Sequence, residues 1–413
     1  MARKMKDSGI EWIGEIPEGW EVVPVKRLCT MQAGKNLTSE QIAPEGTYPV
    51  YGGNGIRGFF SDYNCDGQFL TVGRQGALCG NVHKINGKVW ATVHAVITTP
   101  SSYTILDFLY YLLIGMDLNQ YVSSTAAQPG LAVGTLLNLK TCYPCSTLEQ
   151  TQISNYLNAK CSEIDIMLTK TRSSIEEYKK LKQAVITQAV TKGVRGEREM
   201  KDSGVEWIGK IPREFDPVQL KFFCKLITDG THFSPTTVEN GWPYITAGDV
   251  HGIGLDYNSA KRISEEDFQL LVTQGCQPLK GDVLLVKDGA TTGRVGFVDS
   301  DTPCVILSSV AMLRPADNTD GHYLMYLLAS DFLQKQILVS MAGSAMPRTT
   351  LTKLTKYIGL LPPLHEQKEI ANYLDAKCAE IDGLIAKKEQ LVKELEGYKK
   401  SLIYEVVTGK REV

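Results

Sequence analysis

The sequence predicts an α+β protein made of two copies of one unit, in which a mixed α/β domain precedes a long helix. Two repeated segments carry this prediction. Residues 155–165 (NYLNAKCSEID) and 372–382 (NYLDAKCAEID) are identical at nine of eleven positions. Residues 5–19 and 200–214 are identical at eleven of fifteen. A repeat length of about 200 residues indicates a duplicated domain rather than a solenoid of short repeats.

Each copy of the first repeat, residues 155–165 and 372–382, is called the NYL motif and begins a long helical pattern. Apolar residues follow at alternating steps of four and three, and equivalent positions lie 217 residues apart. This spacing predicts a helix that presents a mostly apolar stripe. From Glu149 to Val190, about 40 residues at about 1.5 Å each would form a rod of about 60 Å. We expect each stripe to pack against the other copy. The polar residues within the stripes, such as Lys182 and Lys399, would then specify the register.

The segment between the repeats is 22 residues longer in the second half than in the first. Both segments have a mixed α/β pattern, beginning at about Trp20 and Phe215. Apolar runs separated by Gly, Asn and Asp predict strands at 48–51, 68–72, 89–98, 244–246, 282–286 and 305–313. Helices are predicted at 105–115 and 321–334. The segments share little identity although their flanks match, a pattern typical of one scaffold presenting two recognition surfaces.

Composition places the chain among soluble globular proteins. It has 413 residues, of which 43% are hydrophobic and 22% charged, and its formal net charge is −2. No apolar run reaches the ~20 residues of a membrane span, and the polar N-terminus does not resemble a signal peptide. Ten cysteines in so long a chain indicate reduced thiols, so a cytoplasmic location is expected. Cys142 and Cys145 are too few ligands for a structural zinc site.

Motifs for catalysis or cofactor binding are weak. Gly53, Gly55 and Gly58 form a G-x-G-x-x-G, but the residues that follow predict strand or loop rather than the helix of a dinucleotide site. Residues 289–294 (GATTGR) lack the Gly-Lys-Ser/Thr of a phosphate-binding loop. Neither H-E-x-x-H nor G-x-S-x-G is present, and residues 361–364 (LPPL) lack the polar and aromatic ends of an amino-methyltransferase tetrapeptide. We therefore expect no catalytic residue, no cofactor and no metal.

Both variable segments contain polar loops whose side chains suit nucleic acid. Arg and Lys read guanine, Asn and Gln read adenine, and small polar groups hold phosphates. Arg74 and Arg294 are the strongest single candidates because each lies among small residues beside an apolar strand. A solvated turn or a satisfied buried group is the alternative for each candidate, and His94 is predicted to be a core histidine. The candidates are Asn54, Arg57, Arg74, Gln75, Gly76, Gln128, Thr231, His232, Lys287, Thr291, Thr292, Arg294 and Arg348.

Over essentially its whole length the chain resembles the specificity (S) subunit of Type I restriction–modification systems. The first half contributes KDSGIEWIGEIP, YPVYGGNGIRGFF and VGRQGALCGNV. The second half contributes KDSGVEWIGKIP, ITDGTHFSP, GDVLLVKDGATTGRVG and PPLHEQKEIANYLDAK. One departure is TCYPCSTLE at 141–149, where the second copy has the more family-like LLPPLHE.

The resemblance implies target-recognition domains at 1–145 and 198–363, a long helix and linker at 146–197, and a second long helix at 364–413 that packs antiparallel to the first. Each domain would read one half of an interrupted, asymmetric site in double-stranded DNA. The helices would bind two methyltransferase (M) subunits and set the distance between the halves, and restriction (R) subunits would join through the complex. No membrane partner is implied. Two alternatives remain: a single-chain methyltransferase or nuclease, and a protein–protein adaptor that binds no nucleic acid.

Overall fold

The structure is a computed structural model that describes residues 3–75, 79–122, 130–251, 254–341 and 347–413. The chain divides into two compact units. Unit 1 comprises Met1–Arg172 with Glu389–Val413, and unit 2 comprises Ser173–Lys388. Two long helices, α3 (Thr147–Lys192) and α8 (Leu364–Val407), each contribute one end to each unit. No helix in the described ranges is long and apolar enough to span a bilayer.

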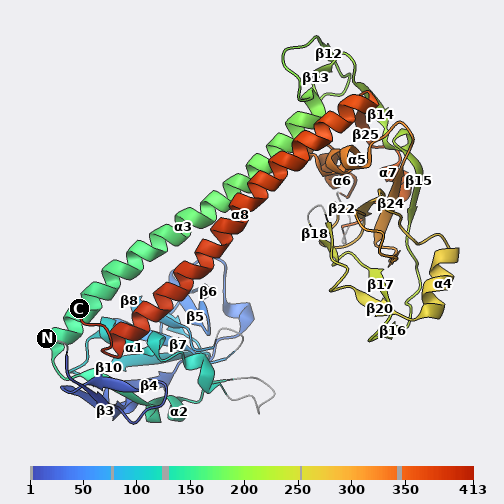
Figure 1. Ribbon diagram of the computed structural model, residues 1–413. Helices are drawn as coiled ribbons and strands as arrows, with labels where there is room; N and C mark the ends of the chain where they lie inside the picture. The colour runs from blue at the N-terminus through green and yellow to red at the C-terminus, as the bar shows by residue number, and fades with distance from the viewer. Residues whose placement is uncertain (1–2, 76–78, 123–129, 252–253, 342–346) are drawn as a thin grey trace. The chain divides into compact units, whose positions relative to one another are not determined.

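Both units contain a four-stranded antiparallel sheet of the same strand order. In unit 1 the order is β4 (Cys29–Ala33), β10 (Ala95–Pro100), β7 (Gln68–Gly73), β8 (Val82–Asn86). In unit 2 it is β15 (Cys224–Asp229), β24 (Val310–Pro315), β21 (Val283–Val286), β22 (Val295–Phe297). Figure 1 labels the four strands of unit 1 and β15, β24 and β22 of unit 2. The duplication therefore extends to the variable segments, whose sequences share little.

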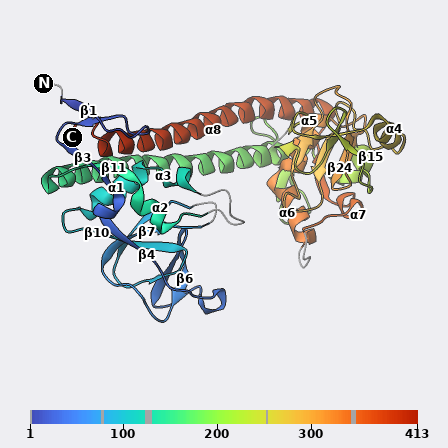
Figure 2. The ribbon, with the colours of Figure 1, turned by 90° about the horizontal axis from the view of Figure 1, so that it is seen from below.

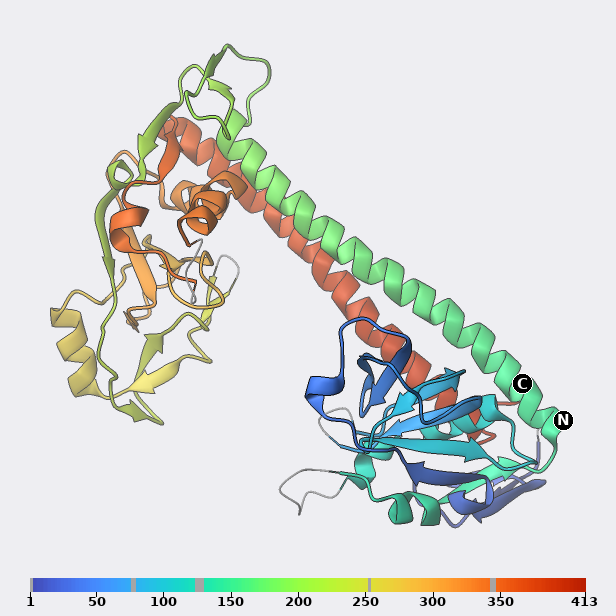
Figure 3. The same cartoon turned by 180° about the vertical axis from the view of Figure 1, so that it is seen from behind.

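A second sheet in each unit contains a parallel strand pair. Unit 1 has β6 (Gly55–Phe60), β5 (Tyr48–Gly52) and β9 (Trp90–Ala91), with β5 and β9 parallel. Unit 2 has β16 (Thr237–Val238), β20 (Lys261–Ile263), β17 (Trp242–Ile245) and β23 (Val305–Ile306), with β17 and β23 parallel. Unit 2 also contains α4 (Glu265–Thr273) and a hairpin of β18 (Val250–His251) and β19 (Gly254–Leu255). Figure 3 shows α4 beside this sheet, on which Phe268 and Leu271 are buried.

Short helices cover the first sheets. In unit 1, α1 (Leu106–Gly115) shares one core with Val72 of the sheet, Leu157 of α3 and Ile403 of α8. Unit 1 also contains α2 (Val133–Asn138). In unit 2, α5 (Gly321–Ala329), α6 (Asp331–Met341) and α7 (Leu351–Leu354) cover the sheet. Four 3₁₀ turns occupy Val25–Arg27, Ser39–Gln41, Leu118–Tyr121 and Leu220–Phe222 in the described residues.

Three predicted elements are wrong because each is broken in two. The predicted strands 89–98 and 305–313 are each two short strands, β9 with β10 and β23 with β24, and the members of each pair belong to different sheets. A turn separates the members, closed by the Ala95 amide on the Thr92 carbonyl in unit 1 (2.9 Å). The predicted helix 321–334 ends at Ala329 because Ser330 is extended (ψ 147°). The Asp331 amide then donates to the Thr187 hydroxyl of α3 at 2.9 Å.

The repeated hairpins are β1 (Met5–Asp7) with β2 (Glu15–Pro17) and β12 (Met200–Asp202) with β13 (Lys210–Pro212). Each leads into a strand that pairs with the strand preceding a long helix. These pairs are β3 (Trp20–Pro24) with β11 (Lys140–Pro144), and β14 (Asp216–Gln219) with β25 (Ile358–Leu361). In unit 1 the first hairpin lies beside the end of α8 (Figure 2), where the Tyr404 hydroxyl donates to the Trp12 carbonyl at 2.8 Å.

The two long helices pack antiparallel, by the stripes that the sequence predicts. In unit 1, Ile164 and Leu168 of α3 share a core with Leu402 and Val406 of α8. In unit 2, the core contains Ile186 and Ala189 near the end of α3 and Leu374 and Cys378 near the start of α8. Figures 1 and 3 show the helices side by side within each unit.

One ion pair between the helices occurs in both units. Lys182 Nζ lies 2.6 Å from an Asp382 carboxylate oxygen, and Lys399 Nζ lies 2.6 Å from Asp165. Adding 217 to Asp165 and Lys182 gives Asp382 and Lys399, so the two pairs are copies of each other. Each joins the last residue of a NYL motif to a lysine within the opposite stripe. This geometry supports a role for these lysines in fixing the register.

Reversing one member of this pair should destabilise unit 2, and reversing both should restore it. In Lys182→Asp, the new carboxylate faces Asp382, so we expect a loss of about 1 kcal/mol, because partly exposed pairs contribute at that level. Lys182→Asp with Asp382→Lys should recover most of that loss. Denaturant unfolding of the four members of the double-mutant cycle measures the coupling. A double variant no more stable than the single one would exclude a register-fixing role.

Candidate nucleic-acid interface

Hydrogen bonds show that the loop after β7 in unit 1 corresponds to the loop after β21 in unit 2. The amide of Arg74 donates to the carbonyl of His94 at 2.9 Å. In unit 2 the amide of Lys287 donates to the carbonyl of Ser309 at 2.8 Å. The carbonyls of Arg74 and Lys287 then accept from the amides of residues 131 and 349, each at 2.9 Å. Arg74 and Lys287 therefore occupy the same position in the two units.

The next residues extend this correspondence. Gln75 forms an antiparallel bridge with Gly130, and Asp288 forms one with Arg348. Gln75 thus corresponds to Asp288, and the guanidinium of Arg348 extends from the position that Gly130 occupies in unit 1.

The segments after β4 and β15 also correspond. Gly34 and Gly230 approach a neighbouring backbone so closely that a Cβ would lie 2.2 Å from the Ala91 carbonyl oxygen in unit 1 and 1.9 Å from that of Ile306 in unit 2. The following residues, Lys35 and Thr231, form parallel bridges with residues 92 and 307. Lys35 is exposed and Thr231 is buried. Lys35 was not predicted from the sequence, because its only signal is a glycine after a strand in both halves.

In unit 1 the predicted polar residues form a cluster of neutral groups around one arginine. Gln75 Oε1 lies 2.5 Å from His94 Nδ1, and Asn81 Nδ2 donates to Asn54 Oδ1 at 2.7 Å. Arg74 is half-buried and its Nε donates to the Leu131 carbonyl at 3.2 Å. His94 is half-buried at a turn, so its prediction as a core histidine is wrong.

Arg57 is exposed on β6, with its side chain over Gly52. Gly76 and Gln128 lie outside the described residues.

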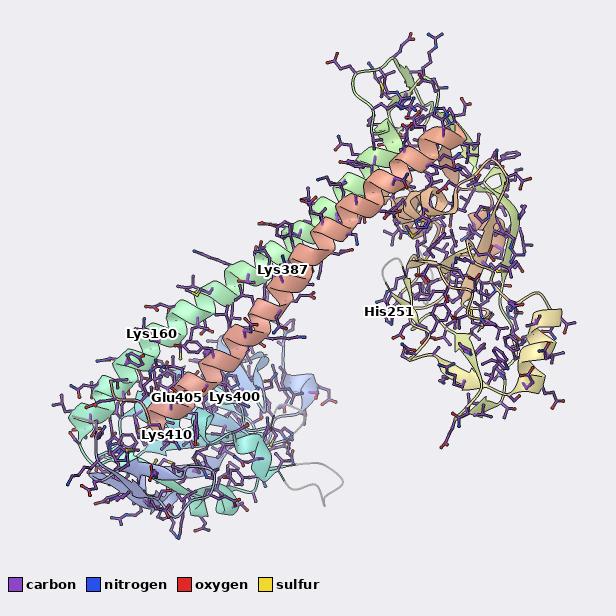
Figure 4. The ribbon with its side chains drawn as sticks, in the orientation of Figure 1. Lys160, His251, Lys387, Lys400, Glu405 and Lys410 are labelled. Atoms are coloured by element: carbon purple, nitrogen blue, oxygen red, sulfur yellow. The ribbon has the colours of Figure 1, made fainter. Side chains whose placement is uncertain are left out.

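Near Arg57, Asn54 lines a cleft of about 1310 Å³ in unit 1, between the second sheet and the long helices. Several cations line the same cleft, and four of them pair with carboxylates: Lys84 with Asp107 (2.8 Å), Lys399 with Asp165 (2.6 Å), Lys400 with Asp117 (3.0 Å) and Arg172 with Glu396. Figure 4 labels Lys400 on α8.

In unit 2 the equivalent loops form a charged cluster around Lys287. Its side chain is 3% exposed, and its Nζ lies 2.9 Å from Asp288 and 3.2 Å from Asp229. His232 is exposed, with its Nε2 3.7 Å from Asp229. Arg348 is 59% exposed and pairs through Nε with Asp288 at 2.9 Å. The two units thus present different chemistry on the same backbone.

Arg294 does not share the position of Arg74. Val286 and Gly73, the last residues of β21 and β7, donate to the carbonyls of Arg294 and Asn81 at 2.8 Å each, so Arg294 corresponds to Asn81. Arg294 is exposed. Thr291 and Thr292 precede it in a tight turn, where the Thr292 hydroxyl donates to the Gly289 carbonyl at 2.7 Å. No cluster of His, Cys, Asp and Glu within the described ranges could hold a metal ion.

Fold and loops together define a duplicated recognition protein, in which two unlike polar loop clusters are built on one framework attached to paired helices. Residues 17–177 and 212–394 match the family described as the Type I restriction modification DNA specificity domain. These matches cover most of the chain, which therefore belongs to that family and is a Type I restriction–modification specificity subunit with DNA-recognition domains.

Named relatives agree with this assignment. A Type I restriction enzyme MjaVIII specificity subunit from Methanocaldococcus jannaschii is 25% identical over 96% of this chain and 93% of its own length. The EcoprrI specificity subunit of Escherichia coli is 44% identical over 121 residues, which are 28% of this chain and 30% of that subunit. A solved structure from work on complex assembly of the type I R-M system covers 96% of this chain and 99% of its own, with a TM-score of 0.70 and 17% identity. That likeness supports the fold.

Proposed function

We propose that this chain reads the two halves of an interrupted, asymmetric site in double-stranded DNA and scaffolds the catalytic subunits of its complex. In this proposal the target-recognition domains are residues 1–145 and 198–363. The long helix and linker at 146–197 and the long helix segment at 364–413 bind two methyltransferase subunits and set the spacing between the halves. Restriction subunits join through that complex. The chain itself contributes no catalytic group.

The observation that carries the proposal is the shared backbone with unlike side chains. The position of Gln75 in unit 1 holds Asp288 in unit 2, and that of Gly130 holds Arg348. Base edges are read by such side chains, and the framework fixes where they stand. Two different sets on one framework are suited to two different half-sites. The net charge of −2 fits a complex whose partners supply much of the phosphate-contacting charge.

The candidate contacts follow from this assignment. In the first domain we propose Asn54, Arg57, Arg74 and Gln75, with Gly76 and Gln128 from the sequence alone. In the second domain the candidates are Thr231, His232, Lys287, Thr291, Thr292, Arg294 and Arg348. We propose a supporting role for Lys287, because a lysine buried between two carboxylates is suited to holding neighbouring groups rather than to touching DNA.

Exchanging residues 20–144 for the matching segment of a relative with different specificity should change one half-site and leave the other unchanged. Methylated sequences mapped genome-wide in a host carrying the complete system provide the measurement. Replacing residues 5–19 by residues 200–214, which are identical at eleven of fifteen positions, is a matched control that should preserve both halves. A change in both halves after exchange of the first segment would show that the domains do not read independently.

A further inference from the structure

Two half-buried carboxylates flank the buried Lys287, and the same framework forms without them in unit 1. Lys287 is 3% exposed and lies between Asp229 and Asp288, and a charge taken out of water in this way is costly unless it is paired. The strand register places Ala33 where unit 2 has Asp229, and the backbone bridges place Gln75 where it has Asp288. The loop can therefore be built around a cation, Arg74, without the two carboxylates, so structural need alone does not explain Asp229 and Asp288.

The charges of Asp229, Lys287 and Asp288 lie behind a fourth charged residue, Arg348, which pairs with Asp288. Its backbone bridges Asp288 and its Nε lies 2.9 Å from Asp288 Oδ1, yet its side chain remains 59% exposed. Lys287 neutralises one of the two carboxylates, and Arg348 balances the other. Because Asp288 also lies 2.9 Å from Lys287, its carboxylate is fixed from the buried side. Arg348 and Asp288 form an ion pair without a hydrogen bond, because Asp288 Oδ1 accepts none from the described residues. The carboxylate therefore holds the guanidinium beside it by charge, while most of the arginine side chain stays exposed.

We propose that Arg348 is the specificity-determining residue of the second domain and reads a guanine, with Asp229, Lys287 and Asp288 as positioning residues behind it. The proposal rests on the proposed function, and it specifies which base the second domain reads and which residues select that base. Guanine presents O6 and N7 to the major groove, and a guanidinium donates to both at once. Lysine at this position would keep the charge but lose the two-pronged geometry. In unit 1 this position holds Gly130, so the first half-site is read without this contact.

The test uses the complete complex of this chain with its methyltransferase subunits. Genome-wide methylation first gives the bipartite site, and exchange of the segment 215–361 identifies the half that the second domain reads. Competition binding is then measured with duplexes in which each guanine of that half is replaced in turn by 7-deazaguanine, which lacks the N7 acceptor. For one guanine, the wild-type complex should lose roughly 10- to 100-fold in affinity, the range expected for a lost bidentate contact.

Variants separate reading from folding. Arg348→Lys and Arg348→Ala should make the complex insensitive to that replacement and relax methylation at that base pair alone. Asp288→Asn should do the same while the first half-site stays intact, and Asp288→Glu should restore part of the discrimination. Arg213→Ala is the matched control, because Arg213 is exposed to a similar degree (67%) and pairs with Glu199 at 2.8 Å on a hairpin far in sequence from the loops. It should change neither half-site.

Several outcomes would overturn the inference. One is a second half-site without guanine, and another is unchanged base preference in Arg348→Lys and Arg348→Ala. A third is an Asp288→Asn complex that melts at lower temperature but keeps full discrimination, since the cluster would then be structural only. If the wild-type complex recognises no bipartite site, the proposed function itself fails. That result differs from one in which the complex recognises a bipartite site but its recognition does not depend on Arg348.

Discussion

Arg198→Met should lower the stability of unit 2 by about 3 kcal/mol. Glu366 at the start of α8 is 1% exposed and pairs with Arg198, which is 12% exposed, stacks over the Phe215 ring at 5.2 Å and also pairs with Glu214 at 2.9 Å. Hydrogen bonding to Glu366 raises the pKa of Arg198 above its usual range. Removing the guanidinium leaves a buried carboxylate without its partner, and a buried charge unpaired in this way typically costs several kcal/mol.

Calorimetry of the complex should show the unit 2 transition at a markedly lower temperature in Arg198→Met. Adding Glu366→Gln should recover part of the loss, because a neutral amide is less costly to bury than an unpaired carboxylate. Arg195→Met is the control. Arg195 pairs with Glu369 on the same turn of α8, but both side chains are 45% exposed, so little change is expected. Equal melting of the Arg198 and Arg195 variants would contradict this account.

The corresponding pair in unit 1 is expected to matter less. Arg3 pairs with Glu149 at 2.5 Å, and their side chains are 32% and 28% exposed. Trp20 Nε1 also donates to Glu149 at 3.0 Å. Water and the indole can therefore compensate when Arg3 is removed. The duplicated position is the same, but its energetic weight depends on burial.

The helices and the duplication were predictable because both are periodic or local signals. The stripe that includes Leu157, Ile164 and Leu168 is buried as the sequence predicts. The resemblance supplied the antiparallel direction, which the paired helix cores show. The break at Ser330 was not predictable in the same way, because the α6 start depends on a hydrogen bond from Asp331 to Thr187 of another element.

The loop candidates were harder to predict, because their roles depend on strand register across long sequence separations. Arg74 and Arg294 look alike in sequence, yet Arg74 corresponds to Lys287 and Arg294 to Asn81. Burial separates residues that composition treats as equal: Lys287 is 3% exposed and Arg348 59%. Residue type alone identifies side chains that are able to contact DNA. Only the fold shows which of them are buried, as Lys287 is, and which are exposed, as Arg348 is.

Gly230→Ala should selectively impair recognition of the half-site read by the second domain. A Cβ at Gly230 would lie 1.9 Å from the Ile306 carbonyl oxygen and 2.3 Å from the carbonyl carbon, so the backbone must move. The amide of Thr231 donates to that same Ile306 oxygen at 3.1 Å. If this oxygen is displaced, Thr231 shifts, and so does Asp229, which precedes Gly230 and pairs with Lys287. Overpacking of this kind costs about 1–3 kcal/mol, and the misplaced loop should weaken binding beyond that loss of stability.

Gly248→Ala separates this effect from the general cost of adding a methyl group. Gly248 lies in the same unit, and its Cβ would meet only the Thr246 hydroxyl at 3.6 Å, an ordinary contact. We expect Gly248→Ala complexes to bind as the wild type does. Gly230→Ala complexes should retain the first half-site while losing discrimination in the second. Equal discrimination by the two variants would mean that the close approach at Gly230 does not position the reading loop. Because Gly34 makes the same approach in unit 1, with a Cβ 2.2 Å from the Ala91 carbonyl oxygen, Gly34→Ala should produce the mirror result.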